Sequence, residues 1–135
     1  MLQELTCLGW ACVLGFVHII IAGNARTKEF GAKWNISARD DKKPPLSPFT
    51  DRLFRAQSNF FETFPLFASA VLIVTVSQSS SVYSHWGALI YLAARTIYFP
   101  LYAFGVPVMR TAVWLLSIIG LLLVLIPPLL TTRVF

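Results

Sequence analysis

Residues 51–78 read DRLFRAQSNFFETFPLFASAVLIVTVSQ, a polar half followed by an almost wholly apolar half. The segment is longer than the roughly 20 residues that a helix needs to cross a membrane. Thr50 or Asp51 would cap its first turn, and Pro65 removes one backbone donor and is expected to bend the helix. The segment therefore predicts a membrane helix, over about residues 51–77, that carries polar side chains at one end.

The rest of the chain predicts three more membrane helices. Hydrophobic residues make up 56% of the 135 residues, charged residues 13%, and the mean hydropathy is +0.68. Further apolar segments cover about residues 2–23, 82–104 and 109–130, and Pro44, Pro45 and Pro48 interrupt the loop over residues 24–50. A short interfacial helix is expected in that loop near Phe30–Ile36. We therefore expect an all-α membrane protein, a four-transmembrane-helix bundle that forms a single domain over residues 1–135.

The basic residues predict the orientation in the membrane. The net charge is +5, and six of the eleven Lys and Arg residues lie between Arg26 and Lys43. A nucleic-acid-binding surface would spread its charges differently, so no nucleic acid partner is expected. The turn between the second and third spans has no basic residue, and the tail has only Arg133. Loop 24–50 is therefore predicted to be cytoplasmic, with both termini on the non-cytoplasmic side of a bacterial inner membrane or the endoplasmic reticulum.

The cysteines and histidines give no sign of metal chemistry. Cys7 and Cys12 are five residues apart on one predicted helix, so they project from different faces and are interpreted as buried structural thiols. His18 and His85 each lack a spaced partner and are interpreted as helix-end or interfacial residues. No metal site is expected.

The polar residues of different spans are predicted to meet at one depth. Arg55, Asn59 and Glu62 follow i, i+4, i+7 spacing and share one stripe of a helix. The third span carries a similar stripe, and the predicted topology brings both stripes to the cytoplasmic half, together with Arg110 at the start of the fourth span. A charged side chain deep in a span costs roughly 2.5 to 3.5 kcal/mol, so it should face protein or a wet cavity. The third-span stripe consists of Arg95, Tyr98 and Tyr102.

Two interpretations of this cluster remain open. In the first interpretation the residues have a purely structural role: Glu62 and Arg95 neutralise each other, and Asn59 binds a neighbouring helix. Alternatively, the excess of arginine over carboxylate would bind a small anion with two carboxylates and one ammonium. Arg110 at a helix N-terminus would then favour a thiolate, and Thr111 adds a hydroxyl donor nearby.

Three segments resemble the MAPEG family, the membrane-associated proteins in eicosanoid and glutathione metabolism. They are RAQSNFFETFPLF (Arg55–Phe67), AARTIYFPLYAFGVPVMRTAVW (Ala93–Trp114) and GNARTKEFG (Gly23–Gly31). The resemblance implies a homotrimer of four-helix protomers, with glutathione as co-substrate bound between subunits near the cytoplasmic face. It also implies that Arg110 stabilises the thiolate as the catalytic residue. The glutathione-binding residues that it implies are Arg26, Arg55, Gln57, Asn59, Glu62, Arg95, Tyr98 and Tyr102.

The sequence departs from the family pattern at two positions. Thr63 stands where leukotriene-synthase-like members have a tyrosine after the glutamate, and Arg110 lies about one residue out of register. The function expected from the resemblance is a glutathione-dependent membrane transferase or peroxidase acting on a lipophilic electrophile that enters from the lipid. A non-catalytic glutathione-binding protein and a small four-helix proton-coupled exporter are the alternatives. An exporter would need a glutamate within the first span, where only Glu4 occurs, at its extreme end.

Overall fold

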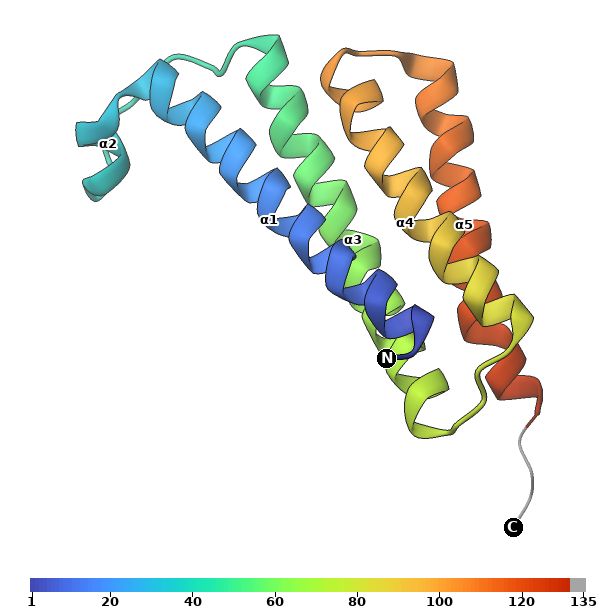
Figure 1. Cartoon of the computed structure of the whole chain (residues 1–135). Coiled ribbons are helices and arrows are strands. Elements are labelled where there is room, and N and C mark those ends of the chain that lie inside the picture. The colour runs from blue at the N-terminus through green and yellow to red at the C-terminus, as the bar shows by residue number, and fades with distance from the viewer. Residues whose placement is uncertain (132–135) are drawn as a thin grey trace.

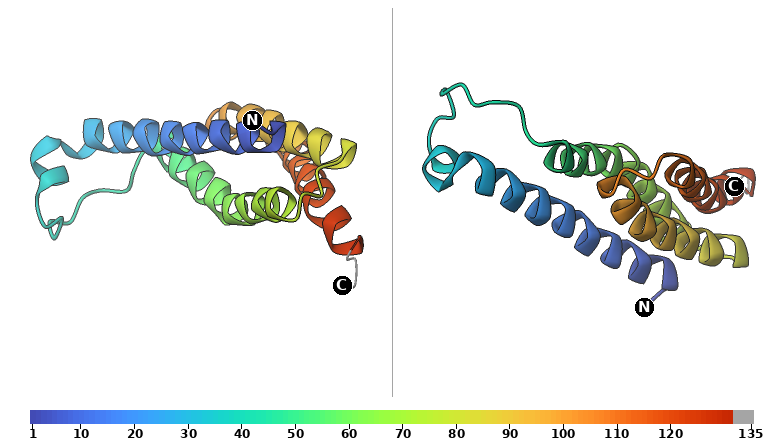
Figure 2. Two further views of the ribbon diagram at one scale, coloured as in Figure 1. Left: turned by 60° about the horizontal axis from the view of Figure 1, so that its bottom comes forward. Right: turned by 90° about the horizontal axis from the view of Figure 1, so that it is seen from above.

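The protein consists of helices joined by short turns and one longer loop. A computed structural model describes residues 1–131, and Arg133 of the predicted tail lies outside these residues. Four long helices run alternately up and down beside one another, and a short fifth helix lies beyond the end of the first (Figures 1 and 2). The described residues contain no strand. The helices are α1 (Gln3–Phe30), α2 (Ala32–Ile36), α3 (Pro48–Val76), α4 (Val82–Ala103) and α5 (Pro107–Leu130).

Three of the four long helices are candidate membrane spans. Helices α1, α3 and α5 are long and apolar enough to cross a membrane. Helix α4 has 22 residues, a sufficient length, but it is not among these candidates. Its sequence carries Ser84, His85 and Arg95. Ser84 and Arg95 are both buried against the other helices. The all-helical, membrane-spanning character expected from composition is therefore found, whereas a fourth span is not established.

Several helix boundaries differ from the predicted ones. Helix α1 continues to Phe30, beyond residue 23, because nothing breaks it before Gly31, which has φ 92°. Helix α3 begins at Pro48 rather than at residue 51, because the Ser47 hydroxyl accepts a hydrogen bond from the Thr50 amide and the proline suits the first turn. Helix α2 coincides with the short helix expected in the loop.

The loop between α1 and α3 is closed by one acidic residue of α1. Glu29 Oε1 accepts a hydrogen bond from the Ser47 amide at 2.8 Å, and Glu29 Oε2 accepts one from the Ser47 hydroxyl at 3.1 Å. The carboxylate therefore lies at the N-terminus of α3, where the helix dipole favours a negative charge. This contact fixes the end of α1 beside the start of α3.

Helices α4 and α5 cross at two glycines. A Cβ atom added to Gly87 would lie 2.6 Å from the Gly120 carbonyl oxygen, and one added to Gly120 would lie 2.7 Å from the Gly87 carbonyl oxygen. Small residues at such a crossing allow two backbones to approach closely. The crossing sets the position of α5, and hence of Arg110, relative to α4.

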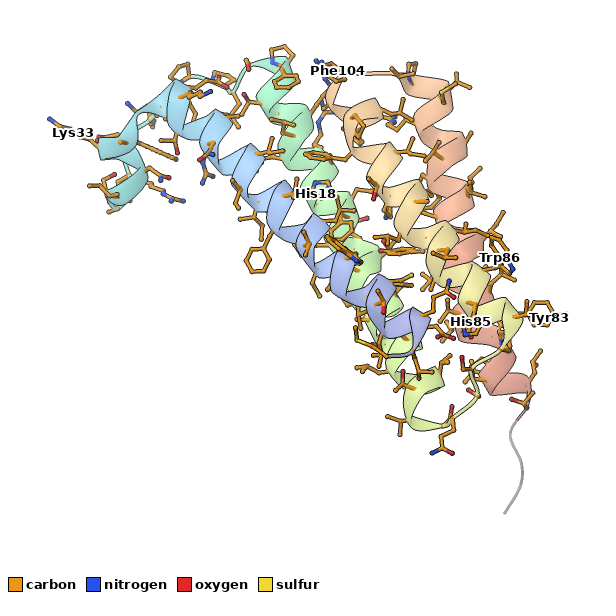
Figure 3. The ribbon with its side chains drawn as sticks, in the orientation of Figure 1. His18, Lys33, Tyr83, His85, Trp86 and Phe104 are labelled. Atoms are coloured by element: carbon orange, nitrogen blue, oxygen red, sulfur yellow. The ribbon has the colours of Figure 1, made fainter. Side chains whose placement is uncertain are left out.

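A buried polar cluster joins α1 to the start of α4. Glu4 is fully buried, and its Oε1 accepts hydrogen bonds from the Ser80 and Ser84 hydroxyls. His85 Nε2 lies 3.5 Å from Glu4 Oε2 and 3.1 Å from the Ser80 hydroxyl. Figure 3 labels His85 at this end of the molecule, beside Tyr83 and Trp86. The same imidazole nitrogen makes both contacts, so the group is a structural link and not a Ser–His–Glu catalytic triad.

Two interpretations of isolated residues are corrected. His18 is not a helix-end residue: it is 1% exposed, within α1, and packs against Phe60 at 5.0 Å and Phe99 at 4.0 Å between ring centroids (Figure 3). Cys7 is buried as expected, but Cys12 is exposed, because the five-residue spacing turns it towards the outside of the bundle. Only Cys7 is therefore a buried thiol.

Candidate functional site

The site is built around Arg95, a charged side chain enclosed by helices. Arg95 is 1% exposed. Its Nη1 donates to Asn59 Oδ1 at 2.8 Å, and its Nη2 donates to the Asn59 carbonyl at 3.2 Å and to the Thr63 hydroxyl at 2.6 Å. All of these acceptors belong to α3. Because a buried charge requires partners of this kind, Arg95 fixes α4 against α3.

Thr63 extends this contact deeper into the bundle. Its hydroxyl shares a hydrogen bond of 2.9 Å with the Tyr91 hydroxyl. The Tyr91 ring stacks on Phe67, with ring centroids 4.0 Å apart. The threonine that departs from the family pattern therefore occupies a defined place between Arg95 and Tyr91.

Glu62 does not form the expected ion pair with Arg95. Glu62 is exposed, and the structure gives it no hydrogen bond or ion pair with Arg95. On a helix, successive residues are turned by about 100°, so Asn59 and Thr63 face α4 while Glu62 points to the side. Glu62 and Arg95 therefore form no direct ion pair within one protomer, whereas Asn59 does bind a neighbouring helix, through Arg95 of α4, as the same interpretation expected.

Arg55, Tyr102 and Arg110 gather at the end where α4 meets α5. The Arg110 guanidinium carbon lies 4.6 Å from the centroid of the Tyr102 ring, and that of Arg55 lies 5.7 Å from it. Arg55 also forms an ion pair of 3.0 Å with Asp51, in which both side chains are half-exposed, so this pair contributes little to stability. The cation–π geometry brings two arginines to the same tyrosine.

The turn between α4 and α5 is held by a residue that sequence analysis did not single out. Arg52 Nε donates to the Ala103 carbonyl at 2.8 Å, near the C-terminus of α4, where a cation is favoured. Gly105 follows with φ 72°, a backbone conformation that glycine adopts without strain. Phe104, the residue before Gly105, is labelled at this end of the molecule in Figure 3. Helix α5 begins two residues after Gly105, at Pro107, and Arg110 is the fourth residue of that helix. The Arg52 contact therefore helps to hold the turn that precedes Arg110.

A cavity of about 250 Å³ lies between α3, α4 and α5 at this end. Four of the predicted site residues line it, and two others, Arg95 and Arg55, contact lining residues without lining it. Trp114 was missed because it resembles the apolar residues around it, and its Nε1 is buried without a hydrogen-bond partner among the described residues. The lining residues are Asn59, Tyr98, Tyr102, Arg110, Thr111 and Trp114.

Arg26 and Gln57 lie on another face of the protomer. The Arg26 guanidinium carbon is 4.9 Å from the Phe54 ring centroid and 5.6 Å from that of Trp34. Gln57 is turned by about 200° from Asn59 on α3, so it faces away from the cavity. Arg26 Nε and Gln57 Oε1 are both buried without a hydrogen-bond partner in the described part of the chain. The predicted site residues therefore form two groups and not one.

A larger hollow occurs at the opposite end. It measures about 680 Å³ and lies between the start of α4 and the end of α5, lined mainly by aliphatic residues such as Leu122 and Ile126. Among the described residues, no charged side chain lines it. In residues 1–131, no three His, Cys, Asp or Glu side chains are grouped as a metal site requires.

The comparison with protein families decides the family. The profile of the MAPEG family matches residues 5–130, nearly the whole chain. The chain belongs to the MAPEG family. A comparison with individual curated proteins gave no match.

Family membership agrees with the helices and with the sequence motifs. The match covers α1 to α5, and it includes the three segments on which the resemblance was based. Three candidate spans and membership of MAPEG make this a membrane protein of that family. The family as a whole is glutathione-related.

Proposed function

We propose that this protein is a glutathione-dependent membrane transferase or peroxidase that acts on lipophilic electrophiles. Glutathione would bind in the cavity between α3, α4 and α5, near the cytoplasmic face. The observation that carries the proposal is the composition of the cavity wall. Asn59, Tyr98, Tyr102 and Arg110 all offer hydrogen-bond donors to one volume, and no carboxylate from residues 1–131 lines it.

The electrostatics of the cavity suit an anionic peptide. Arg110 and Arg55 approach the same tyrosine from two helices, and arginine binds carboxylates in a bidentate manner. Glutathione carries two carboxylates, one ammonium and a thiol. Glu62, which is exposed on α3 three residues after Asn59, is one of the glutathione-binding residues that the family resemblance implies, and its carboxylate suits the ammonium.

The size of the cavity supports a site that a neighbouring subunit completes. Small-molecule sites have volumes of roughly 300–1,000 Å³, and this cavity of about 250 Å³ is at or below the lower end. Arg26 and Gln57 each have a buried polar atom without a partner, on a face that is turned away from the cavity. We propose that the chain forms a homotrimer in which Arg26 and Gln57 of one subunit contact glutathione in the cavity of the next.

The connections at both ends of α4 support a fourth span. Only residues 77–81 join α3 to α4, and residues 104–106 join α4 to α5. If α3 and α5 cross the membrane in the same direction, α4 must return across the same thickness (Figure 1). We propose four spans, with loop 31–47 on the cytoplasmic side because of its lysines and arginine. The membrane is a bacterial inner membrane or the endoplasmic reticulum.

The chemistry assigns a task to Arg110. A guanidinium beside the sulfur would stabilise the thiolate, the nucleophilic form. In the transferase reaction the thiolate forms a carbon–sulfur bond with the electrophile, and the electron pair passes to the leaving group or to a conjugated oxygen, which takes up a proton. In the peroxidase reaction the thiolate breaks the oxygen–oxygen bond of a hydroperoxide, and a second glutathione yields the disulfide, an alcohol and water.

The proposal is tested by titrating glutathione into the detergent-purified protein and then screening electrophiles and lipid hydroperoxides for turnover. Saturable binding with conjugation or peroxide reduction is the expected result. Binding without turnover of any compound would favour a non-catalytic glutathione-binding protein, the alternative left open by the register of Arg110. Absence of saturable binding would refute both.

A further inference from the structure

Arg95 is the largest of the fully buried side chains, yet it does not line the cavity. We infer that Arg95 is a positioning residue, which orients the side-chain amide of Asn59 so that its N–H groups serve the ligand. The inference rests on the proposed function, since it assigns a task to Asn59 within that site. It differs from the role implied by the family resemblance, in which Arg95 binds glutathione directly.

The orientation of the Asn59 amide follows from the chemistry of arginine. A guanidinium only donates hydrogen bonds, so the Asn59 atom that lies 2.8 Å from Arg95 Nη1 must be the oxygen Oδ1. The nitrogen Nδ2 is then on the other branch of the amide. It makes no hydrogen bond within the described residues and is not among the polar atoms enclosed by protein. Because Asn59 lines the cavity, Nδ2 is the group that Asn59 offers to it.

Arg95 is itself held in one orientation. Its Nη2 donates to Thr63, whose hydroxyl bonds Tyr91, and its guanidinium carbon lies 5.1 Å from the ring centroid of Tyr98. Rotation of the guanidinium would break these contacts together. The chain of contacts Tyr91–Thr63–Arg95–Asn59, called the relay below, therefore fixes which face of the amide meets the ligand.

The relay completes a wall that selects acceptor groups. The Thr111 hydroxyl donates to the Pro107 carbonyl at 3.1 Å, so its hydrogen is already used, but Arg110 and Asn59 Nδ2 remain available to a ligand. An asparagine in the reverse orientation would present a carbonyl oxygen and would favour a donor. The part of the ligand beside Asn59 is therefore a carboxylate or a peptide carbonyl and not an ammonium.

The first test is Asn59→Asp. A carboxylate keeps, and strengthens, the contact with Arg95, but replaces the Nδ2 donor with an oxygen. We expect the affinity for glutathione, measured by titration calorimetry, to fall by about tenfold to a hundredfold, the effect of losing one hydrogen bond to a charged group, with no loss of thermal stability. Unchanged affinity in a stable Asn59→Asp variant would show that Nδ2 does not meet the ligand and would overturn the inference.

The second test acts on the relay at a distance from the cavity. Thr63→Val removes the hydroxyl that holds Arg95, whereas Thr63→Ser retains it. We expect glutathione affinity to fall several-fold in the valine variant and to be restored by serine. Thr75→Val is the matched control, because its hydroxyl also lies on α3 but bonds the Val71 carbonyl far from the cavity. Equal affinities of the Thr63→Val and Thr75→Val variants would overturn the relay.

Failure of the proposed function is distinguishable from failure of the inference. If the wild-type protein does not bind glutathione, the proposed function fails, and the relay is judged by thermal stability in detergent. Asn59→Asp at least as stable as the wild type, with Asn59→Leu and Thr63→Val less stable, supports the relay. Equal stability of all three variants would overturn it.

Discussion

Substitution of Gly87 by alanine is expected to separate α4 from α5. The added Cβ would lie 2.6 Å from the Gly120 carbonyl oxygen and 2.8 Å from Leu123 Cβ. The first contact is about 0.8 Å shorter than the 3.4 Å at which ordinary contact begins. The obstacle is backbone and not the end of a flexible side chain, so the helices must move apart.

The expected cost follows from known overpacking effects. Inserting a methyl group into a tightly packed contact destabilises by about 1–3 kcal/mol, and a backbone obstacle favours the upper part of that range. Alanine in a helix interior regains about 0.5–1 kcal/mol relative to glycine. The Gly87→Ala variant should therefore lose about 2 kcal/mol of unfolding free energy.

Gly9→Ala provides the matched control. A Cβ at Gly9, on α1, meets nothing within 4 Å, so the variant should gain about 0.5–1 kcal/mol from helix propensity alone. Both variants are unfolded by titration with denaturing detergent while helicity is followed by circular dichroism. Equal midpoints for Gly87→Ala and Gly9→Ala would refute the close crossing of α4 and α5.

Three further predictions concern the site and the polar cluster at the other end. Arg110→Ala should lower the turnover number by roughly 10²- to 10³-fold with a smaller change in glutathione affinity, measured by conjugation kinetics and calorimetry; unchanged turnover would remove its catalytic role. Trp114→Phe retains an aromatic ring, although a smaller one, and removes an N–H that is buried without a partner among the described residues, so ligand affinity should decrease by up to about tenfold; a titration in which affinity is retained would exclude this donor. Glu4→Ala leaves the hydroxyls of Ser80 and Ser84 without their shared acceptor and should cost about 2–4 kcal/mol in unfolding free energy; detergent unfolding with a wild-type midpoint would show that the cluster is not structural.

Helical periodicity predicted much of the site because polar side chains in a membrane helix have few suitable directions. The spacing of Arg55 and Asn59 on one helix, and of Tyr98 and Tyr102 on another, placed each pair on a single face. The alternation of helices then brought Arg110 to the same end. The structure groups these residues around one cavity or directly beside it.

The partners of individual side chains were not predictable in the same way. Charge alone paired Arg95 with Glu62, but the crossing of α3 and α4 brings Asn59 and Thr63 to the guanidinium instead. His18 gave no sign of its depth, because its burial depends on Phe60 and Phe99 from two other helices. Such contacts depend on how helices rotate against one another, which a single helix period does not determine.

The limits of the helices on either side of the long loop were predicted less well. The first span was predicted to end at residue 23, where the apolar run stops, but α1 continues through polar residues to Gly31, whose backbone conformation ends it. The short helix α2 was expected in the loop and is found there. The start of α3 depends on Ser47, which is held by Glu29 from the end of α1. Ser47 followed by Pro48 is a local start signal that the prediction passed over in favour of Thr50 or Asp51, whereas the contact with Glu29 spans the whole loop and has no local signal.

The central claim is tested most directly by determining the structure of the protein with bound glutathione in a lipid nanodisc. The account predicts a trimer with one glutathione in each cavity, within hydrogen-bond distance of Asn59 Nδ2 and of Arg110, and with Arg26 and Gln57 contributed by the adjacent subunit. Glutathione bound elsewhere, or a cavity that stays empty at saturating glutathione while Arg26 faces lipid, would contradict it.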